Sequence, residues 1–358
     1  MSKPSSSFAH LFGREDLIQT LLDQAASQLL PHALAFTGPE GSGRSSLAKA
    51  LAQLLLCENP QAQGACGVCP SCRYFAAGTH PDFKVLVPED QKLIKVDRLR
   101  KELVADLQLL PQIGPSKIYL LAADYLNEQG QNVLLKSLEE PPPHAYFILT
   151  VRDLGQLLPT VVSRIRAYPL EPLADRQLVE ILRQAGYSQQ LDFLAAYAQG
   201  NPGQALALAS REGFADLRQS ILDLLTSLPS QTYLDMVADS HRLLLAEKDS
   251  FSDILEMILT VLRDLGLLLA GQTQGLINSD QAARLQQLAG QVLAGQTDPA
   301  SRAQAIQRLQ GAEAFMTSLG RAMQVNVNYE ILTWSLLQEL KTAFSPDQSQ
   351  PGSGVRTP

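Results

Sequence analysis

A glycine-rich turn between a short apolar run and a helical pattern constrains the fold of this 358-residue chain more than any other feature. The turn, GPEGSGRS (38–45), directly follows the apolar run HALAFTG (32–38) and opens a helical pattern. Glycines there let backbone N–H groups turn inward around a phosphate, and the amino end of a helix attracts the same negative charge. This order of strand, turn and helix predicts a phosphate-binding loop of the G-x-x-x-x-G-K-[ST] type. Its candidate binding residues are Gly38, Gly43, Arg44 and Ser45.

The loop departs from that pattern, because Arg44 stands where the motif has lysine. Lysine is a compact point charge, and the planar guanidinium is not equivalent to it. Enzymes with such loops also need an acidic residue at the end of a neighbouring strand to hold Mg²⁺. Here the apolar run 117–123 ends in Ala122-Ala123, with only Asp124 nearby. We therefore expect a degenerate loop that neither hydrolyses ATP nor binds it functionally; the alternative is a glycine turn that only joins strand to helix.

Alternating strand and helix patterns extend over the first half of the chain. Further apolar runs of strand length lie at 83–88, 117–123 and 145–151, and helical patterns lie at 45–56, 96–109 and 128–138. This alternation predicts an α/β domain with helices on both faces of a parallel sheet. After Pro172 only helical patterns remain, including one buried stripe over 254–269.

The patterns predict three domains between two loose ends. The α/β domain is expected over 8–170, a small helical domain over 171–209, and an all-α domain over 210–344. The ends, 1–7 and 345–358, are poor in core-forming residues and are expected to be flexible or disordered.

Composition excludes several classes of protein. With 29 Lys+Arg against 36 Asp+Glu, the net charge of −7 argues against a surface that grips nucleic acid everywhere. A local basic cluster could still contact phosphates, although a solvated helical face explains it equally well: Lys92, Lys95, Arg98, Arg100 and Lys101. Charged residues interrupt the longest apolar stretch, and the start lacks the apolar core of a signal peptide. A cytoplasmic protein is therefore expected.

All four cysteines fall in one segment, at Cys57, Cys66, Cys69 and Cys72. The spacing C-x8-C-x2-C-x2-C lets four soft thiolates converge on one ion, which suits a structural Zn²⁺. An iron–sulfur cluster is the rival, but Ala76 stands where its usual next Cys would be. The alternative without a metal ion is four separate buried thiols.

Two later motifs carry a resemblance to a known family. Residues 132–142, NVLLKSLEEPP, resemble the NALLKTLEEPP motif of the clamp-loader ATPases of the AAA+ superfamily. Residues 157–164, LLPTVVSR, resemble that family's LLPTxxSR motif, which contains the Ser-Arg pair of an arginine finger. The match covers residues 8 to about 340. It implies that the α/β domain is the RecA-like domain of an AAA+ protein and that the small helical domain is a lid, and the last domain resembles the family's helical collar less specifically.

This resemblance implies a role in replication as one subunit of the bacterial DNA polymerase III clamp loader. Partners would be the other subunits of a hetero-pentameric ring, with the sliding clamp and primed DNA reached through the complex. Arg164, with Ser163, would act as an arginine finger on the ATP site of the adjoining subunit. Gly203 stands where ATP-hydrolysing members tend to have a lid arginine, so the resemblance implies a subunit that does not hydrolyse ATP itself.

Two other functions compete with this interpretation. The first is an ATP-hydrolysing motor subunit of the same machine, which Arg44 and Ala122-Ala123 disfavour. The second is a separate zinc-dependent DNA-binding protein, which the acidic composition and the closed set of four cysteines disfavour.

Overall fold

The computed structural model describes residues 8, 11–89, 92–322 and 328–345, and the chain forms two compact units. The first unit comprises 1–185 and 198–206, and the second comprises 186–197 and 207–358. The predicted flexible ends, 1–7 and nearly all of 345–358, lie outside the described residues. The three predicted domains, with boundaries at 170 and 209, stay a prediction.

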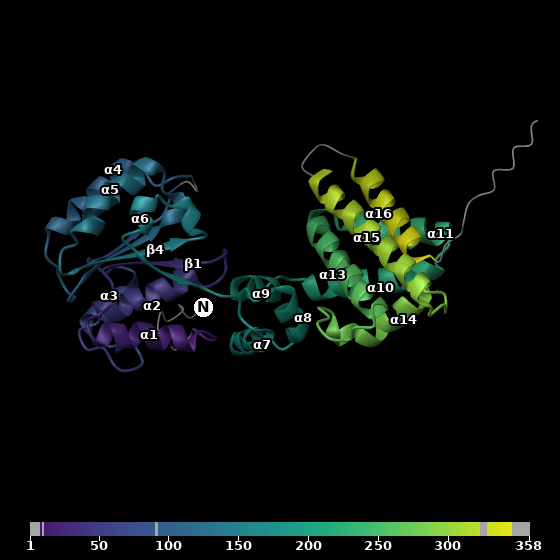
Figure 1. Ribbon diagram of the computed structural model, residues 1–358, viewed down its shortest axis with the longest axis horizontal. Helices are drawn as coiled ribbons and strands as arrows, with labels where there is room; N and C mark the ends of the chain where they lie inside the picture. The colour runs from purple at the N-terminus through teal and green to yellow at the C-terminus, as the bar shows by residue number, and fades with distance from the viewer. Residues whose placement is uncertain (1–7, 9–10, 90–91, 323–327, 346–358) are drawn as a thin grey trace, which may run out of the picture. The chain divides into compact units, whose positions relative to one another are not determined.

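A five-stranded parallel sheet forms the centre of the first unit (Figure 1). Its strands lie in the order β2-β3-β4-β1-β5. The strands are β1 (Ala33–Thr37), β2 (Phe83–Leu86), β3 (Lys117–Ala122), β4 (Ala145–Val151) and β5 (Arg166–Pro169). The first four confirm the predicted runs. The sequence patterns missed β5, because its residues, RAYP, do not form a continuous apolar run, whereas the equally short edge strand β2 (FKVL) lies in one.

Side chains alternate between the two faces of the sheet, and helices cover both. On β1, Leu34 and Phe36 face one apolar core, whereas Ala33 and Ala35 face the other. The first core is closed by α1 (Glu15–Ala26), α2 (Arg44–Leu56) and α3 (Pro70–Ala77), and the second by α4 (Val96–Leu99), α5 (Glu128–Glu139) and α6 (Pro159–Val162) (Figure 1). The predicted α/β domain, with helices on both faces of a parallel sheet, is thereby confirmed.

The helix predicted over 96–109 is shorter than expected. Only Val96–Leu99 is α-helical, followed by a π turn (Arg100–Val104) and a 3-10 turn (Asp106–Gln108). The buried Lys117 donates from Nζ to the backbone oxygen of Asp106 at 2.9 Å and also to its carboxylate. The Asp106 oxygen also accepts the backbone N–H of Leu109 at 3.0 Å, so the Lys117 contact ties this final 3-10 turn to β3.

The second unit is built of helices in its described residues. They are α8 (Leu191–Tyr197), α10 (Phe214–Ser227), α11 (Tyr233–Asp235), α12 (Arg242–Ala246), α13 (Phe251–Leu269), α14 (Ala282–Val292), α15 (Pro299–Ala322) and α16 (Tyr329–Phe344). The apolar stripe predicted over 254–269 lies on α13 and is buried except at Leu268, which is half-buried. Among the residues described, no helix has both the length and the apolar character needed to cross a membrane.

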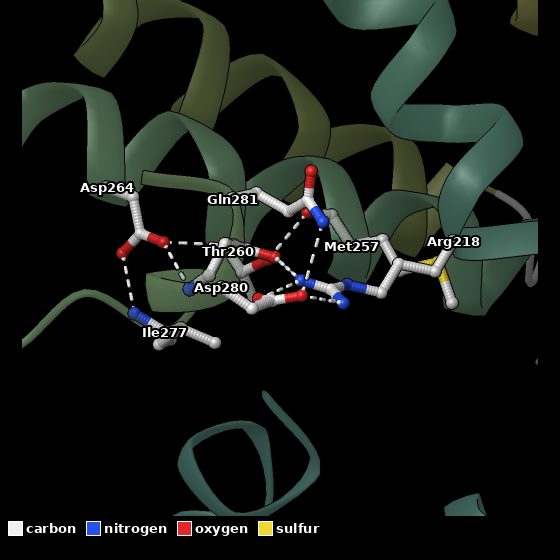
Figure 2. A network of polar contacts seen from close by, with 8 residues as sticks. Arg218, Met257, Thr260, Asp264, Ile277, Asp280 and Gln281 are labelled. Atoms are coloured by element: carbon white, nitrogen blue, oxygen red, sulfur yellow. Dashed lines mark hydrogen bonds and ion pairs between the residues drawn. The ribbon is translucent and has the colours of Figure 1, made fainter. Parts of the chain in front are cut away.

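A buried polar network fixes the loop after α13 in this unit (Figure 2). Asp264, fully buried on α13, accepts backbone N–H groups from Ile277 and Asn278 at 3.0 and 2.7 Å. Arg218 of α10 makes a two-point ion pair with Asp280, with N···O distances of 2.7 and 2.9 Å. Its guanidinium also lies over the ring of Phe193, 3.5 Å from the centroid. Buried charges need such partners, so this network fixes one arrangement of α8, α10 and α13.

Candidate functional site

The glycine-rich turn lies where the sequence predicts it, between β1 and α2 in the first unit. Gly43 precedes α2 with a φ of 93°, a left-handed conformation that a side chain would strain. Beside the turn is a cleft of about 670 Å³. Its lining includes Gly41, Gly43, Arg44 and Ser45 of the turn, and Ala122, Asp124, Thr150 and Arg152 after or at the ends of β3 and β4.

Arg44 does not point freely into this cleft, because it pairs with Asp124. Nη1 of Arg44 lies 3.0 Å from Oδ2 of Asp124, and the two side chains are only 12% and 19% exposed. The other carboxylate oxygen of Asp124 accepts the backbone N–H of Arg152 at 2.6 Å. The cation at the lysine position and the acid near the end of β3 therefore satisfy each other within the chain.

The residue at the lid position packs directly on the glycine-rich turn. Gly203, in the first turn of α9 (Pro202–Ala209), donates its backbone N–H to the oxygen of Gly41 at 2.9 Å. A Cβ atom on Gly203 would lie 2.6 Å from the Cα of Gly41, so no larger residue fits without movement. The amide of Asn201 adds a 2.7 Å hydrogen bond to the oxygen of Glu40. The backbone occupies the space that a lid arginine would need.

A second arginine, Arg14, also binds the glycine-rich turn. Arg14 donates to the backbone oxygen of Ser42 from Nη2 and to that of Glu171 from Nη1, both at 3.0 Å. Burial lowers the pKa of Arg14, and the neighbouring Glu171 partly opposes this shift. Hydrogen bonds from Arg14, Asn201 and Gly203 thus hold the glycine-rich turn in place.

Arg164 and Ser163 lie just after α6 and just before the edge strand β5. Nη1 of Arg164 donates to the backbone oxygen of Thr160 at 2.7 Å and to Oγ of Ser163 at 3.1 Å. Nη2 forms an ion pair with Oε1 of Glu139 at 2.5 Å, and the Arg164 side chain is one-third exposed. The ion pair joins the two sequence motifs that carry the family resemblance, SR and LEEPP.

The sheet separates Arg164 from the chain's own glycine-rich turn. Arg166 of β5 pairs with Leu34 near the start of β1, whereas the turn follows Thr37 at the end of β1. Strands rise about 3.3 Å per residue, so roughly 10 Å of parallel sheet lies between the two levels. Arg164 is at the amino end of the sheet edge and the turn is at the carboxyl end.

The four cysteines come together as a possible metal site. Their sulfur atoms all lie within 4.8 Å of one another, and three of the four residues are buried. Four thiolates about 2.3 Å from one tetrahedral ion would be about 3.8 Å apart, which this cluster can accommodate. Backbone N–H groups of Cys66, Cys69 and Cys72 point at the sulfurs of Cys57, Cys66 and Cys69 at 3.3–3.4 Å. The set of soft donors fits a metal ion such as Zn²⁺.

The surroundings affect the cysteines differently. Backbone N–H groups, that of Val68 foremost, lower the pKa of Cys66 to about 6. Burial raises the pKa of the Cys57 and Cys72 thiols. Metal binding requires thiolates, so an ion here would release protons on binding.

A buried hydrogen-bond chain connects the cysteine cluster to the sheet. Ser71, between two of the cysteines, donates to the oxygen of Leu56 and lies 2.9 Å from Nε2 of His80. Nδ1 of His80 accepts the backbone N–H of Asp82 at 3.1 Å. Because Nδ1 accepts and the Ser71 hydroxyl is already used as a donor, His80 is neutral with its proton on Nε2. Burial lowers the pKa of His80, with Asp82 opposing the shift.

The predicted basic cluster divides into two groups. Arg98 donates to the backbone oxygen of Val87 and to the carboxylate of Glu102, so its charge is engaged within the chain. Arg100 lies 3.4 Å from Asp97. The Arg100 side chain is nevertheless 65% exposed, so it faces solvent together with Lys92, Lys95 and Lys101.

Several residues around the cleft escaped the sequence analysis. Arg14, Thr150, Arg152 and Asn201 belong to no local motif, and each reaches the turn or the cleft through the fold. These residues could not be identified from the sequence, because only the tertiary structure brings them to the turn or the cleft.

Comparison with known proteins agrees with the motifs. Residues 13–174 match the family described as DNA polymerase III, delta subunit. The chain is 40% identical over 179 residues to DNA polymerase III subunit delta' of Pseudomonas aeruginosa, covering 49% of this chain and 50% of that protein. It is 35% identical over 211 residues to subunit delta' of Escherichia coli, covering 58% of this chain and 63% of that protein.

A match to subunit tau of Escherichia coli is 32% identical over 212 residues, covering 57% of this chain and 32% of that protein. The chain thus spans between half and slightly under two thirds of the two delta' relatives. These matches confirm the predicted resemblance to subunits of the DNA polymerase III clamp loader.

Proposed function

From the match of residues 13–174 to the family described as DNA polymerase III, delta subunit, and from the similarity to delta' subunits, we propose that the chain is a delta-prime clamp-loader subunit that does not hydrolyse ATP. It would act in the cytoplasm within a hetero-pentameric ring that loads the sliding clamp onto primed DNA. The helical second unit would supply the collar through which the ring assembles.

The ion pair between Arg44 and Asp124 carries the proposal that this subunit does not hydrolyse ATP. Phosphoryl transfer needs a cation free to reach the β- and γ-phosphates and an acid free to hold Mg²⁺. Here the only charged side chains at those two places neutralise each other, and Ala122 and Ala123 offer no other carboxylate. The packing of Gly203 on Gly41 further supports a turn that needs no nucleotide to hold its shape.

We assign Arg164 the role of an arginine finger acting in trans. A guanidinium aimed at a transferring phosphoryl group stabilises the charge that develops there. Its place at the amino end of the sheet edge, away from the chain's own turn, supports action on a neighbouring subunit. Ser163 would orient it, since the hydroxyl of Ser163 accepts from Nη1.

The cysteine cluster would hold a structural Zn²⁺ through Cys57, Cys66, Cys69 and Cys72. Four thiolates close the coordination shell and leave no open position for substrate. The ion would fix the segment between α2 and α3, and His80 would transmit that order to the sheet.

The closest competing function is an ATP-hydrolysing motor subunit, because tau is also a relative. The test uses the chain purified alone and after co-expression with its cognate clamp-loader subunits. We expect it to enter the complex and, alone, to show no ATP turnover above background, with the cognate motor subunit as positive control. Arg44→Lys should not restore turnover, since Asp124 and the two alanines remain. Turnover by the isolated wild-type chain would instead support the motor function, and failure to enter the complex would overturn both.

A further inference from the structure

Glu139 forms an ion pair with Arg164, and the position of Glu139 on its own helix does not explain why a glutamate stands there. Glu139 is the last residue of α5, where the helix dipole disfavours a negative charge. It is followed by a second exposed glutamate, Glu140. Among the described residues only the first of the two makes an ion pair, and its partner is Arg164 at 2.5 Å.

The hydrogen bonds and the ion pair of the Arg164 side chain hold it against its own chain. A guanidinium carries five N–H donors. In the described part of the chain, both on Nη1 are used, for Thr160 and Ser163, and one on Nη2 is used for Glu139. Two of these three acceptors are neutral and lie within four residues of Arg164, so Glu139 is the one charged group that holds the side chain.

A phosphate can replace Glu139 as the partner of Arg164, because this ion pair is exposed to solvent. The side chains of Arg164 and Glu139 are 33% and 47% exposed, and exposed pairs are weak because water screens them. A phosphate carries more charge than one carboxylate and accepts the same paired N–H groups. An incoming phosphate can therefore displace Glu139 without breaking any buried contact.

We propose that Glu139 is a positioning residue that latches Arg164 on its own subunit until the neighbour's nucleotide displaces it. The inference rests on the proposed function, since it deepens the role of Arg164. The ion pair with Glu139 reduces the fraction of complexes in which Arg164 is free to contact the neighbour's nucleotide. The apparent affinity for that nucleotide falls in proportion to this fraction. The latch therefore acts on KM for ATP at the neighbouring site and leaves the later chemical step unchanged.

The test is Glu139→Gln in the reconstituted clamp loader, with Glu140→Gln as the matched control. The Arg164-dependent rate is obtained by subtracting the ATPase rate of the complex that contains Arg164→Ala. On this part of the rate, Glu139→Gln should lower KM for ATP by about two- to fivefold, the range expected for releasing an exposed ion pair. The kcat should stay within about twofold, and Glu140→Gln should match wild type.

A double variant separates a latch from a structural effect. Glu139→Gln combined with Arg164→Ala should behave as Arg164→Ala alone, because the latch acts only through the finger. An unchanged KM in Glu139→Gln would overturn the latch while Arg164→Ala still impairs the complex. An unaltered ATPase in Arg164→Ala would instead overturn the proposed function itself.

Discussion

The guanidinium of Arg44 and the carboxylate of Asp124 meet at 3.0 Å in the cleft beside the glycine-rich turn. The contact joins the start of α2 to the segment that follows β3, across 80 residues of sequence. The ion pair links the glycine-rich turn to the sheet. In an active ATPase, bound nucleotide and Mg²⁺ would make this link.

Loss of this ion pair should destabilise the first unit. Arg44→Ala leaves the mostly buried Asp124 without its cation, so we expect a loss of about 1–3 kcal/mol in the free energy of unfolding. Asp124→Asn should have a similar effect, and the two should be strongly non-additive in a double-mutant cycle. Urea unfolding measures both, with Lys49→Ala on the exposed face of α2 as control. Additive losses would show that the two side chains do not support each other.

The cysteine cluster should carry one zinc ion per chain. Cys69→Ser removes a thiolate that also caps α3, so the metal should be lost and the first unit destabilised. Because all four cysteines of the chain lie in this cluster, thiol titration with and without a chelator reports on the site alone. Metal analysis of freshly purified, reduced protein gives the stoichiometry, and the absence of zinc there would exclude the assignment.

Stability should fall as the pH drops below about 6.5, with His80 contributing to the loss. Burial lowers the pKa of His80 in the folded chain, so the unfolded chain binds more protons as the pH passes below the usual histidine value of about 6.5. This penalty is absent at higher pH and grows as the pH falls toward the lowered pKa. His80→Asn keeps an acceptor for Asp82 but cannot titrate, so its stability should depend less steeply on pH between 7 and 5.

Chemical unfolding of wild type and His80→Asn at several pH values checks this expectation. Any effect of acid on the cysteines is common to both proteins and cancels in the difference. Equal pH slopes would mean that the protonation of His80 is not linked to folding.

The sequence predicted what local patterns encode. The glycine-rich turn and the cysteine spacing lie within short segments, so their chemistry could be recognised before any fold was known. Strands β1 to β4 were equally clear, because each lies in a continuous apolar run. The edge strand β5 was missed because its residues, RAYP, include an arginine and a proline and form no such run.

Partners far apart in the sequence could not be predicted in the same way. Asp124 looked like a leftover acid near a lost pair, and its pairing with Arg44 depends on β3 and β1 lying in one sheet. Glu139 looked like a solvated helix end until α5 and α6 brought it to Arg164. The close approach of Gly203 to Gly41 likewise follows only from tertiary structure.

The central claim is that this chain supplies Arg164 to a neighbouring ATP site. The most direct measurement compares clamp loading and DNA-stimulated ATPase of complexes reconstituted with wild type, Arg164→Ala or the nearby control Arg166→Ala. We expect Arg164→Ala to fold and join the complex, yet to abolish clamp loading and remove part of the ATPase. Arginine fingers contribute about 10³–10⁵ in other systems, but here only one of several sites would depend on this residue. Equal clamp loading and ATPase with wild type and Arg164→Ala, in fully assembled complexes, would contradict the account.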